Sequence, residues 1–276
     1  MKKIFILLLA VVLLVGCTTQ KSEKLPLANN LASEKNIEEV AEIFGENSLN
    51  ADYLKVSTED FSKIVGEKAN LAKDWVHPNK LKPDVFECMD RWDKADYPDS
   101  NCRMTTFMLT EGLIKAKKTE NKYKGTYLMF DEDAIKDKRY APIKENIKLF
   151  TTLFGEKDVS DVKKYDLSKF WETVWDDYGI SFENDNATLI SVIILDPYDK
   201  VLFVGHTGVL IDCEEYYLFI EKIAFQQPYQ ATKVKNKADL LKILAKRPEY
   251  FGGDEEGPFV YENGELICEN LKDYKK

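Results

Sequence analysis

The chain has 276 residues, of which 44% are hydrophobic and 32% are charged. Its formal net charge of −9 excludes nucleic acid as an expected partner, because phosphate binding requires clustered Lys and Arg. Because His77 and His206 are its two histidines, a His-rich metal cluster is excluded, and no cofactor is expected.

The N-terminus reads as an export signal. Lys2 and Lys3 precede an apolar run over 4–15, which is shorter than the roughly 20 residues that a membrane-spanning helix needs. Leu14-Val15-Gly16-Cys17 resembles the lipobox of bacterial lipoproteins. The resemblance implies that Cys17 receives a diacylglycerol thioether, becomes the mature N-terminus and anchors the protein to the extracytoplasmic face of the cell membrane, since two acyl chains anchor stably.

The segment after the lipobox is polar, with Thr, Gln, Lys, Ser, Pro and Asn and little apolar pattern. Such a composition cannot bury enough surface to fold, so residues 17–29 are predicted to be a flexible tether. The signal covers 1–16. No linker or repeat divides the remainder, and residues 30–276 are therefore expected to form a single domain.

The first half of this domain has helical periodicity. An apolar stripe over 37–44 ends at Gly45, and Ser57 with Asp60 resembles a capping box that opens a second helix. Gly155 and Gly179 close two later stripes, which include Trp171 and Trp175 as expected core residues. The predicted helices cover 37–45, 57–75, 83–92, 101–117, 143–155 and 167–179.

After Gly179 the apolar pattern changes to short β-branched runs separated by turns. Strands are predicted over 187–195, 201–211 and 216–224, with a further one over 230–234 and a last helix over 237–245. Helices followed by a meander of strands indicate an α+β fold, with a helical N-terminal half packed on a C-terminal antiparallel sheet.

Cys102 is the candidate nucleophile. The N-cap residue types at 99–101 place it in the first turn of a helix, where free N–H groups and the helix dipole lower a thiol pKa. Its N–H would help form an oxyanion hole, and Asn101 and Gln226 are further candidates for oxyanion or substrate binding. The alternatives are a buried core cysteine or a disulfide, with Cys88 as one partner, since an exported chain with Cys88, Cys102, Cys213 and Cys268 allows three pairings.

The candidate general base is His206, which lies in an apolar strand between Gly205 and Gly208, and these glycines are expected to leave space for substrate. If the following turn is centred between Cys213 and Glu214, His206 faces Glu221 directly. A slip of one residue would present Lys222 instead. The alternatives are a core histidine and a surface salt-bridge glutamate.

Two other features, Cys88 and the acidic run at 131–133, are expected to have no catalytic or metal-binding role. Cys88 lies on an apolar helix stripe and is expected in the core. Asp131-Glu132-Asp133 lacks the spacing and glycine of a calcium loop and is expected to be solvated acid.

A cysteine at a helix N-terminus followed by a histidine on a later strand resembles papain-like enzymes, especially the NlpC-type cell-wall cysteine peptidases. His206-Thr207-Gly208-Val209 is similar to the H-V-G-I of that family, whereas Asn101-Cys102-Arg103-Met104 differs from its D-C-S-G. The resemblance implies a papain-like fold and hydrolysis of peptide or amide bonds by Cys102, His206 and Glu221.

Nearly the whole mature chain also resembles an uncharacterised family of Gram-positive lipoproteins with a domain of unknown function. The resemblance rests on 101–103 with 106–107, on 204–209, and on 219–222 with 225–230. This resemblance implies that the chain is an envelope protein, and it implies no particular activity. Two hypotheses follow: a membrane-anchored thiol hydrolase acting on cell-wall peptides or other envelope amides, or a non-catalytic binding or adaptor module.

Overall fold

The computed structural model describes residues 24–95, 97, 99–120, 122–251 and 256–275. The predicted signal, Cys17 and the first residues of the predicted tether lie outside this range. Among the described residues, no helix is both long and apolar enough to cross a membrane.

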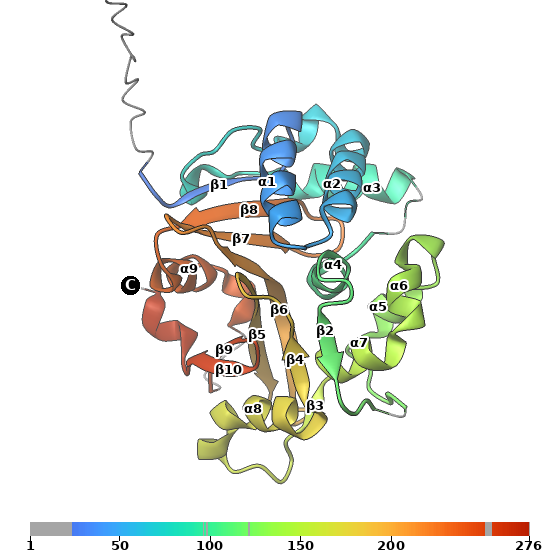
Figure 1. The fold of residues 1–276 in the computed structure, drawn as a ribbon, viewed down its shortest axis with the longest axis vertical. Coiled ribbons are helices and arrows are strands. Elements are labelled where there is room, and N and C mark those ends of the chain that lie inside the picture. Colours follow the sequence, from blue (N-terminus) through green and yellow to red (C-terminus); the bar gives the residue numbers. More distant parts are fainter. Residues whose placement is uncertain (1–23, 96, 98, 121, 252–255, 276) are drawn as a thin grey trace, which may run out of the picture.

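The fold is α+β, as predicted (Figure 1). Its main sheet has the strand order β1-β8-β7-β6-β5-β9-β10, with every neighbouring pair antiparallel, and a short strand β3 pairs with the start of β6. The strands of this sheet are β1 Leu27–Asn29, β3 Lys157–Asp158, β5 Ala187–Asp196, β6 Val201–Asp212, β7 Tyr217–Lys222, β8 Tyr229–Val234, β9 Phe259–Glu262 and β10 Glu265–Cys268. A second sheet pairs β2 Ile114–Ala116 with β4 Ile180–Phe182.

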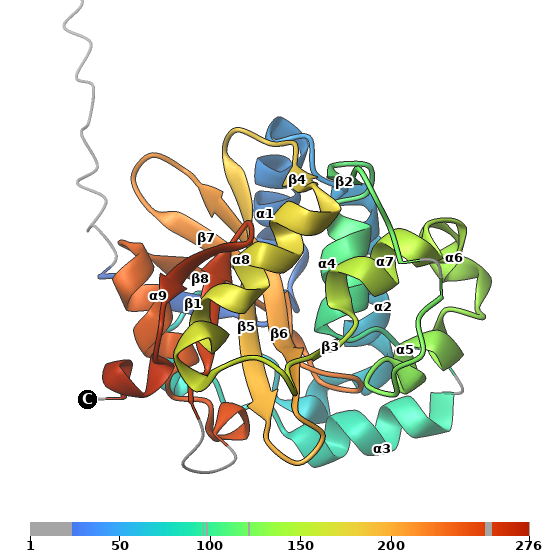
Figure 2. The ribbon, with the colours of Figure 1, turned by 90° about the horizontal axis from the view of Figure 1, so that it is seen from below.

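The helices lie on both faces of the main sheet. They are α1 Glu34–Glu46, α2 Ala51–Val65, α3 Val85–Ala95, α4 Cys102–Leu109, α5 Met129–Ala134, α6 Ala141–Glu145, α7 Ile147–Phe154, α8 Leu167–Tyr178 and α9 Lys237–Leu244. Short 3₁₀ helices are η1 Glu67–Ala69, η2 Pro78–Lys80, η3 Lys138–Tyr140, η4 Lys164–Asp166, η5 Pro248–Tyr250 and η6 Leu271–Tyr274. In both Figure 1 and Figure 2, α4 and α9 lie on opposite sides of β6.

Each face of the sheet has its own apolar core. The larger core joins α1, α2, α4 and α7 to Val209 and Ile220 of the sheet. The smaller one packs the apolar side of α9 against Leu210 and Phe219. Consecutive residues of a strand thus enter different cores, as the alternation of side chains in a strand requires. The expected core positions of Cys88, Trp171 and Trp175 are confirmed.

The N-terminal boundary of the domain differs from the prediction. Residues 27–29, assigned to the tether, form β1 and pair with 231–233 of β8. Three residues in an edge strand carry too little apolar periodicity to be distinguished from a polar tether by sequence alone.

Several helix boundaries also differ. The second helix begins after Asn50, whose Oδ1 accepts the N–H of Tyr53 at 3.0 Å, so the predicted cap Ser57 lies inside α2. The fourth helix ends at Leu109, and Gly112 with a φ of 79° precedes β2. The helix expected over 143–155 is divided into α6 and α7 at Asn146.

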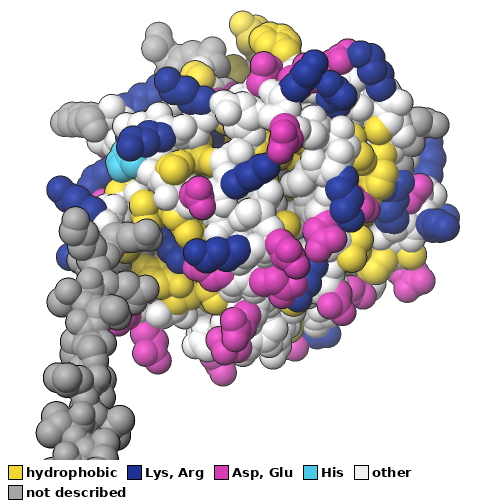
Figure 3. Space-filling model, turned by 90° about the horizontal axis from the view of Figure 1, so that it is seen from above, with side chains coloured by type: hydrophobic (Ala, Val, Ile, Leu, Met, Phe, Trp, Pro, Cys, Tyr) yellow, Lys and Arg dark blue, Asp and Glu magenta, His cyan; other side chains and the backbone are white. Residues whose placement is uncertain are grey.

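Charged side chains of both signs are interspersed on the face that Figure 3 shows. This arrangement agrees with acid dispersed over a solvated surface rather than gathered into one patch.

Candidate active site

Cys102 is the first residue of α4, as the sequence predicts. Asn101 has an extended backbone, and its Oδ1 accepts the N–H of Met104 at 3.0 Å, which is the geometry of an N-cap. The thiol is free, as are those of the other described cysteines, Cys88, Cys213 and Cys268. The structure therefore contains no disulfide among these four residues.

His206 is placed by a β-bulge in β6. His206 pairs with Val192, but the next pair joins Val204 to Ile193, so Gly205 is an extra residue on β6. Bulges redirect the side chains beside them and are frequent at functional sites.

The two glycines near His206 make room for different things: Gly205 lines the cavity at His206, whereas Gly208 makes room for core packing. A Cβ on Gly205 would lie 2.2 Å from Cδ1 of Ile194, and one on Gly208 would lie 2.6 Å from Cζ of Phe219. A side chain at either position would therefore collide with a neighbouring apolar side chain.

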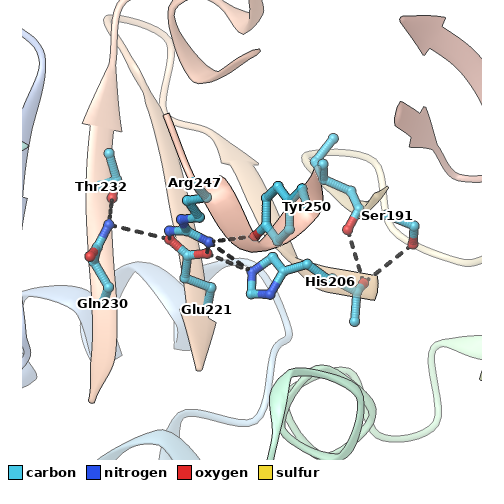
Figure 4. A network of polar contacts seen from close by, with 9 residues as sticks. Ser191, His206, Glu221, Gln230, Thr232, Arg247 and Tyr250 are labelled. Carbon is cyan, nitrogen blue, oxygen red and sulfur yellow. Dashed lines mark hydrogen bonds and ion pairs between the residues drawn. The ribbon is translucent and has the colours of Figure 1, made fainter. Parts of the chain in front are cut away.

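The predicted pairing of β6 with β7 is wrong by two residues. Val209 pairs with Ile220 and Asp212 with Tyr217, so the turn is centred between Glu214 and Glu215. Because side chains alternate along a strand, an error of two keeps Glu221 on the same face as His206, now on the diagonal. Nε2 of His206 lies 2.6 Å from Oε2 of Glu221, and the predicted contact is present (Figure 4).

Arg247 completes this cluster and was not predicted. It follows α9, and its guanidinium binds Glu221 in a bidentate pair, with Nη1 at 2.6 Å from Oε2 and Nη2 at 2.5 Å from Oε1. Nη1 also donates to the hydroxyl of Tyr250 at 2.8 Å, and the Tyr250 ring lies 5.7 Å from that of His206. Figure 4 shows Glu221 between Arg247 and Gln230, whose amide donates to Oε1 at 3.3 Å.

Glu221 is held in its charged form although its side chain is only 1% exposed. Burial raises the pKa of this carboxyl, but the charge of Arg247 and the hydrogen bond with His206 outweigh burial and lower the pKa to about 2. A permanent carboxylate on Nε2 of His206 fixes the ring and favours the protonated imidazole.

The thiol and the imidazole act on each other. Burial raises the pKa of Cys102, yet hydrogen bonding to His206, the charges of His206 and Arg103, and the Thr207 backbone together bring the thiol pKa below its ordinary value. Burial lowers the pKa of His206, but bonds to Cys102 and Glu221 raise it above the usual range. Since Glu221 contacts Nε2, Nδ1 is the ring nitrogen left for sulfur. This is the electrostatic pattern of a thiolate–imidazolium pair.

The thiol reaches His206 where the two central strands separate. Helix α4 packs against both β6 and β7. The β6–β7 pairs extend from Asp212 and Tyr217 to Val209 and Ile220 and stop there. Thr207 lies beyond the last pair, which leaves its backbone available to the sulfur of Cys102.

A second buried ion pair holds the start of α4. Arg103 donates from Nε and Nη2 to the two carboxylate oxygens of Asp131 at 3.0 and 2.6 Å, and from Nη1 to the carbonyl of Val204 at 3.1 Å. Asp131 is fully buried, so its assignment to solvated acid is wrong. The amide of Asn101 also donates to Asp131, at 2.9 Å. With both ends of its amide engaged, Asn101 is a structural cap, and its predicted role in oxyanion or substrate binding is not supported.

Gln226 is likewise engaged away from His206. Its backbone N–H donates to Asp99 at 2.6 Å, and its Nε2 donates to Asp93 at 2.6 Å. It lines a cavity with Trp92 and Asp93, whereas its neighbour Gln227 lines the cavity at His206. The predicted substrate role of Gln226 is therefore not supported by its position.

Lys222 points to the opposite face from Glu221. Its Nζ is buried and lies 3.0 Å from Oδ2 of Asp99 and 4.3 Å from the ring centre of Phe61. Burial lowers the pKa of Lys222. The pair joins the end of β7 to the segment that precedes Cys102, and Nζ also donates to the carbonyls of Ala224 and Gln227.

A cavity of about 460 Å³ opens beside His206. It is lined by Ile194, Phe203, Gly205, His206, Ile223, Ala224, Gln227, Glu249 and Tyr250. Among the described residues, no group of three or more His, Cys, Asp or Glu side chains is arranged to hold a metal ion.

The described chain is thus an α+β protein in which a helix N-terminus and an antiparallel sheet bring together a buried cysteine, histidine and glutamate with a part-buried arginine. The chain belongs to the family described as Domain of unknown function (DUF4300), which matches residues 27–267. The predicted membership of an uncharacterised family is confirmed. Neither a curated protein nor a solved structure matches the chain.

Proposed function

We propose that this protein is a thiol hydrolase of amide or peptide bonds, with Cys102 as nucleophile. One observation carries the proposal: Cys102 opens α4, and its interaction with His206 helps to lower the pKa of its thiol despite burial. Buried groups with such opposed pKa shifts are typical of catalytic sites. The order of cysteine helix and histidine strand supports the resemblance to papain-like enzymes.

In the proposed reaction, the Cys102 thiolate attacks the amide carbonyl carbon and forms a tetrahedral oxyanion. The C–N bond then breaks, and the leaving nitrogen takes the proton that His206 holds. This step leaves an acyl thioester on Cys102. Water, deprotonated by the now neutral His206, attacks the thioester and releases the carboxylic acid, which restores the thiolate and the imidazolium.

The supporting residues have separate tasks in this scheme. Glu221 keeps the imidazole oriented and stabilises its charge, while Arg247 keeps Glu221 ionised. The Oδ1 of Asn101 takes the N–H of Met104, and the N–H of Cys102 remains the predicted oxyanion donor.

The proposed place of action is the extracytoplasmic face of the cell membrane. The lipobox-like Leu14-Val15-Gly16-Cys17 supports a lipid anchor on Cys17, and envelope peptides are the amides within reach of such an anchor. Replacement of Cys17 by Ala is expected to move the protein from the membrane fraction to the soluble fraction of cells that express it.

The test uses p-nitrophenyl acetate, a general acyl donor. The wild-type protein is expected to release a burst of p-nitrophenolate equal to one acetyl thioester per chain, mapped to Cys102 by peptide mass spectrometry. Cys102→Ala removes the burst. Cys213→Ala is the matched control, because Cys213 is a half-buried free thiol whose pKa burial raises, and this variant keeps the burst. A burst that survives in Cys102→Ala contradicts the proposal.

One observation favours the second candidate, a non-catalytic module in which the cluster is structural: Cys102 is 5% exposed and His206 is 2% exposed. Under that hypothesis, Cys102→Ala lowers the urea midpoint of unfolding by the large amount typical of a core truncation, and the wild type gives no acetyl thioester. Under the hydrolase hypothesis, the folded wild-type protein forms the acetyl thioester on Cys102, whatever the effect of Cys102→Ala on stability. The acetyl thioester of the wild type and the urea midpoint of Cys102→Ala therefore together separate the candidates.

A further inference from the structure

The cavity at His206 adjoins two others. Ile194, Phe203, Glu249 and Tyr250 line both the His206 cavity and a cavity of about 270 Å³ beside the β5–β6 turn. Ile223, Gln227 and Glu249 line both the His206 cavity and a third cavity, of about 390 Å³, beside η2. These three cavities, named here the His206 groove, form a series with His206 in the middle.

The walls of the His206 groove suit an extended chain with apolar side groups. Toward the β5–β6 turn they include Pro197, Tyr198 and Phe251. Toward η2 they include Pro78, Leu81, Pro83, Pro228 and Ile243. Aromatic, proline and branched side chains at both ends provide apolar contact area on each side of His206.

Glu249 lines all three cavities. It lies in η5, between Pro248 and Tyr250, and its side chain is exposed. No described residue forms a hydrogen bond or an ion pair with its carboxylate. By contrast, the neighbouring Arg247 is bound to Glu221, and Lys246 donates to Asn79 at 3.3 Å.

We propose that the His206 groove binds an extended peptide that carries a positively charged group, and that Glu249 is the residue that selects this charge. The inference rests on the proposed function and names its substrate class. An unpaired carboxylate in the same cavity as His206 attracts an ammonium or guanidinium group, and it repels a carboxylate. The apolar walls then hold the chain on both sides.

The test measures how charge affects the reaction of small reagents with Cys102. The probes are three methanethiosulfonates, with a cationic 2-aminoethyl, a neutral methyl or an anionic 2-sulfonatoethyl group. Each forms a mixed disulfide with the thiolate and releases methanesulfinate. Rates at Cys102 are read by peptide mass spectrometry and divided by the rates with a simple thiol. The variant is Glu249→Gln, and the control is Glu183→Gln, an exposed glutamate beyond the opposite end of β5 from Ile194.

The expected result is a cation-to-anion rate ratio that falls about tenfold in Glu249→Gln. Loss of this negative charge from the groove slows the cationic reagent and accelerates the anionic one, by about threefold each. Glu183→Gln keeps the wild-type ratio. An unchanged ratio in Glu249→Gln overturns the inference and leaves the proposed function standing. If even the neutral reagent fails to modify Cys102 in the folded protein, the proposed function falls and the inference falls with it.

Discussion

The bidentate pair between Arg247 and Glu221 makes a strong prediction for the variant Arg247→Met. The substitution keeps much of the side-chain volume but leaves the carboxylate of Glu221 buried, with its Arg247 partner gone. Breaking a buried pair in this way costs about 3–5 kcal/mol, because the remaining charge has lost its compensation. We expect the free energy of unfolding at neutral pH to fall by an amount in this range.

The pKa of Glu221 gives an independent magnitude. Its folded value of about 2 lies below the ordinary value of 4.5. Since one pKa unit corresponds to about 1.4 kcal/mol, folding stabilises the charged form of Glu221 by roughly 3 kcal/mol relative to the unfolded chain, and this contribution is present at neutral pH. Both arguments therefore lead to about 3 kcal/mol.

The assay is urea unfolding followed by tryptophan fluorescence, in a double-mutant cycle. Arg247→Met, Glu221→Gln and the double variant are compared with the wild type. The double variant is expected to be less destabilised than the sum of the single variants by about 3 kcal/mol, because it carries no unpaired charge. Additive single variants, or a loss below about 1 kcal/mol in Arg247→Met, would show that the Arg247–Glu221 pair contributes little to stability.

The remaining predictions concern unfolding at low pH, the buried Arg103–Asp131 ion pair and Gly208 of strand β6. The stability that Glu221 contributes is complete above about pH 4.5 and is lost as the pH falls toward about 2, so Glu221→Gln flattens the loss in urea midpoint between about pH 6 and pH 3. Arg103→Met leaves Asp131 buried and lowers the free energy of unfolding by about 3 kcal/mol, whereas Arg91→Met breaks an exposed helix pair and costs less than about 0.5 kcal/mol in the same assay. Gly208→Ala would place a Cβ 2.7 Å from the backbone of β7 and lowers stability by about 1–3 kcal/mol, visible as a lower melting temperature.

The sequence predicts the local structure well where both ends of an element have clear signals. Helix α8 has the predicted bounds, because its apolar stripe stops at Tyr178 and Gly179 adopts a φ of 57°. Strands β5 to β8 lie within two residues of the prediction at each end. The second helix was misplaced because Ser57 and Asp60 have the residue types of a capping box. The residue that accepts the first free N–H is Asn50, seven positions earlier.

The candidate site was predicted in part. Cys102, His206 and Glu221 come together because a helix start, a strand and a hairpin are local features, and the side-chain alternation tolerates a register error of two. Arg247 follows α9, which packs on the opposite face of the sheet from α4 (Figure 1), and no local sequence pattern connects Arg247 to Glu221. One signal was available: the chain has four arginines, Arg91, Arg103, Arg139 and Arg247, among many lysines, and Arg is the residue suited to buried bidentate pairs.

The buried Asp131 shows a second limit of sequence reasoning. In an acidic run, the residue that turns inward is decided by where Arg103 lies after folding, a tertiary fact. Composition places all three acids in solvent, and the structure places Asp131 beneath the start of α4.

The most direct test of the central claim is the rate at which iodoacetamide alkylates Cys102 as a function of pH, measured by peptide mass spectrometry. We expect a rate that stays high below the ordinary pKa of a thiol, since His206, Arg103 and the Thr207 backbone lower the pKa of Cys102. We further expect that His206→Gln moves the rise in rate to higher pH. A profile that rises only at the ordinary thiol pKa, unchanged by His206→Gln, would contradict the account.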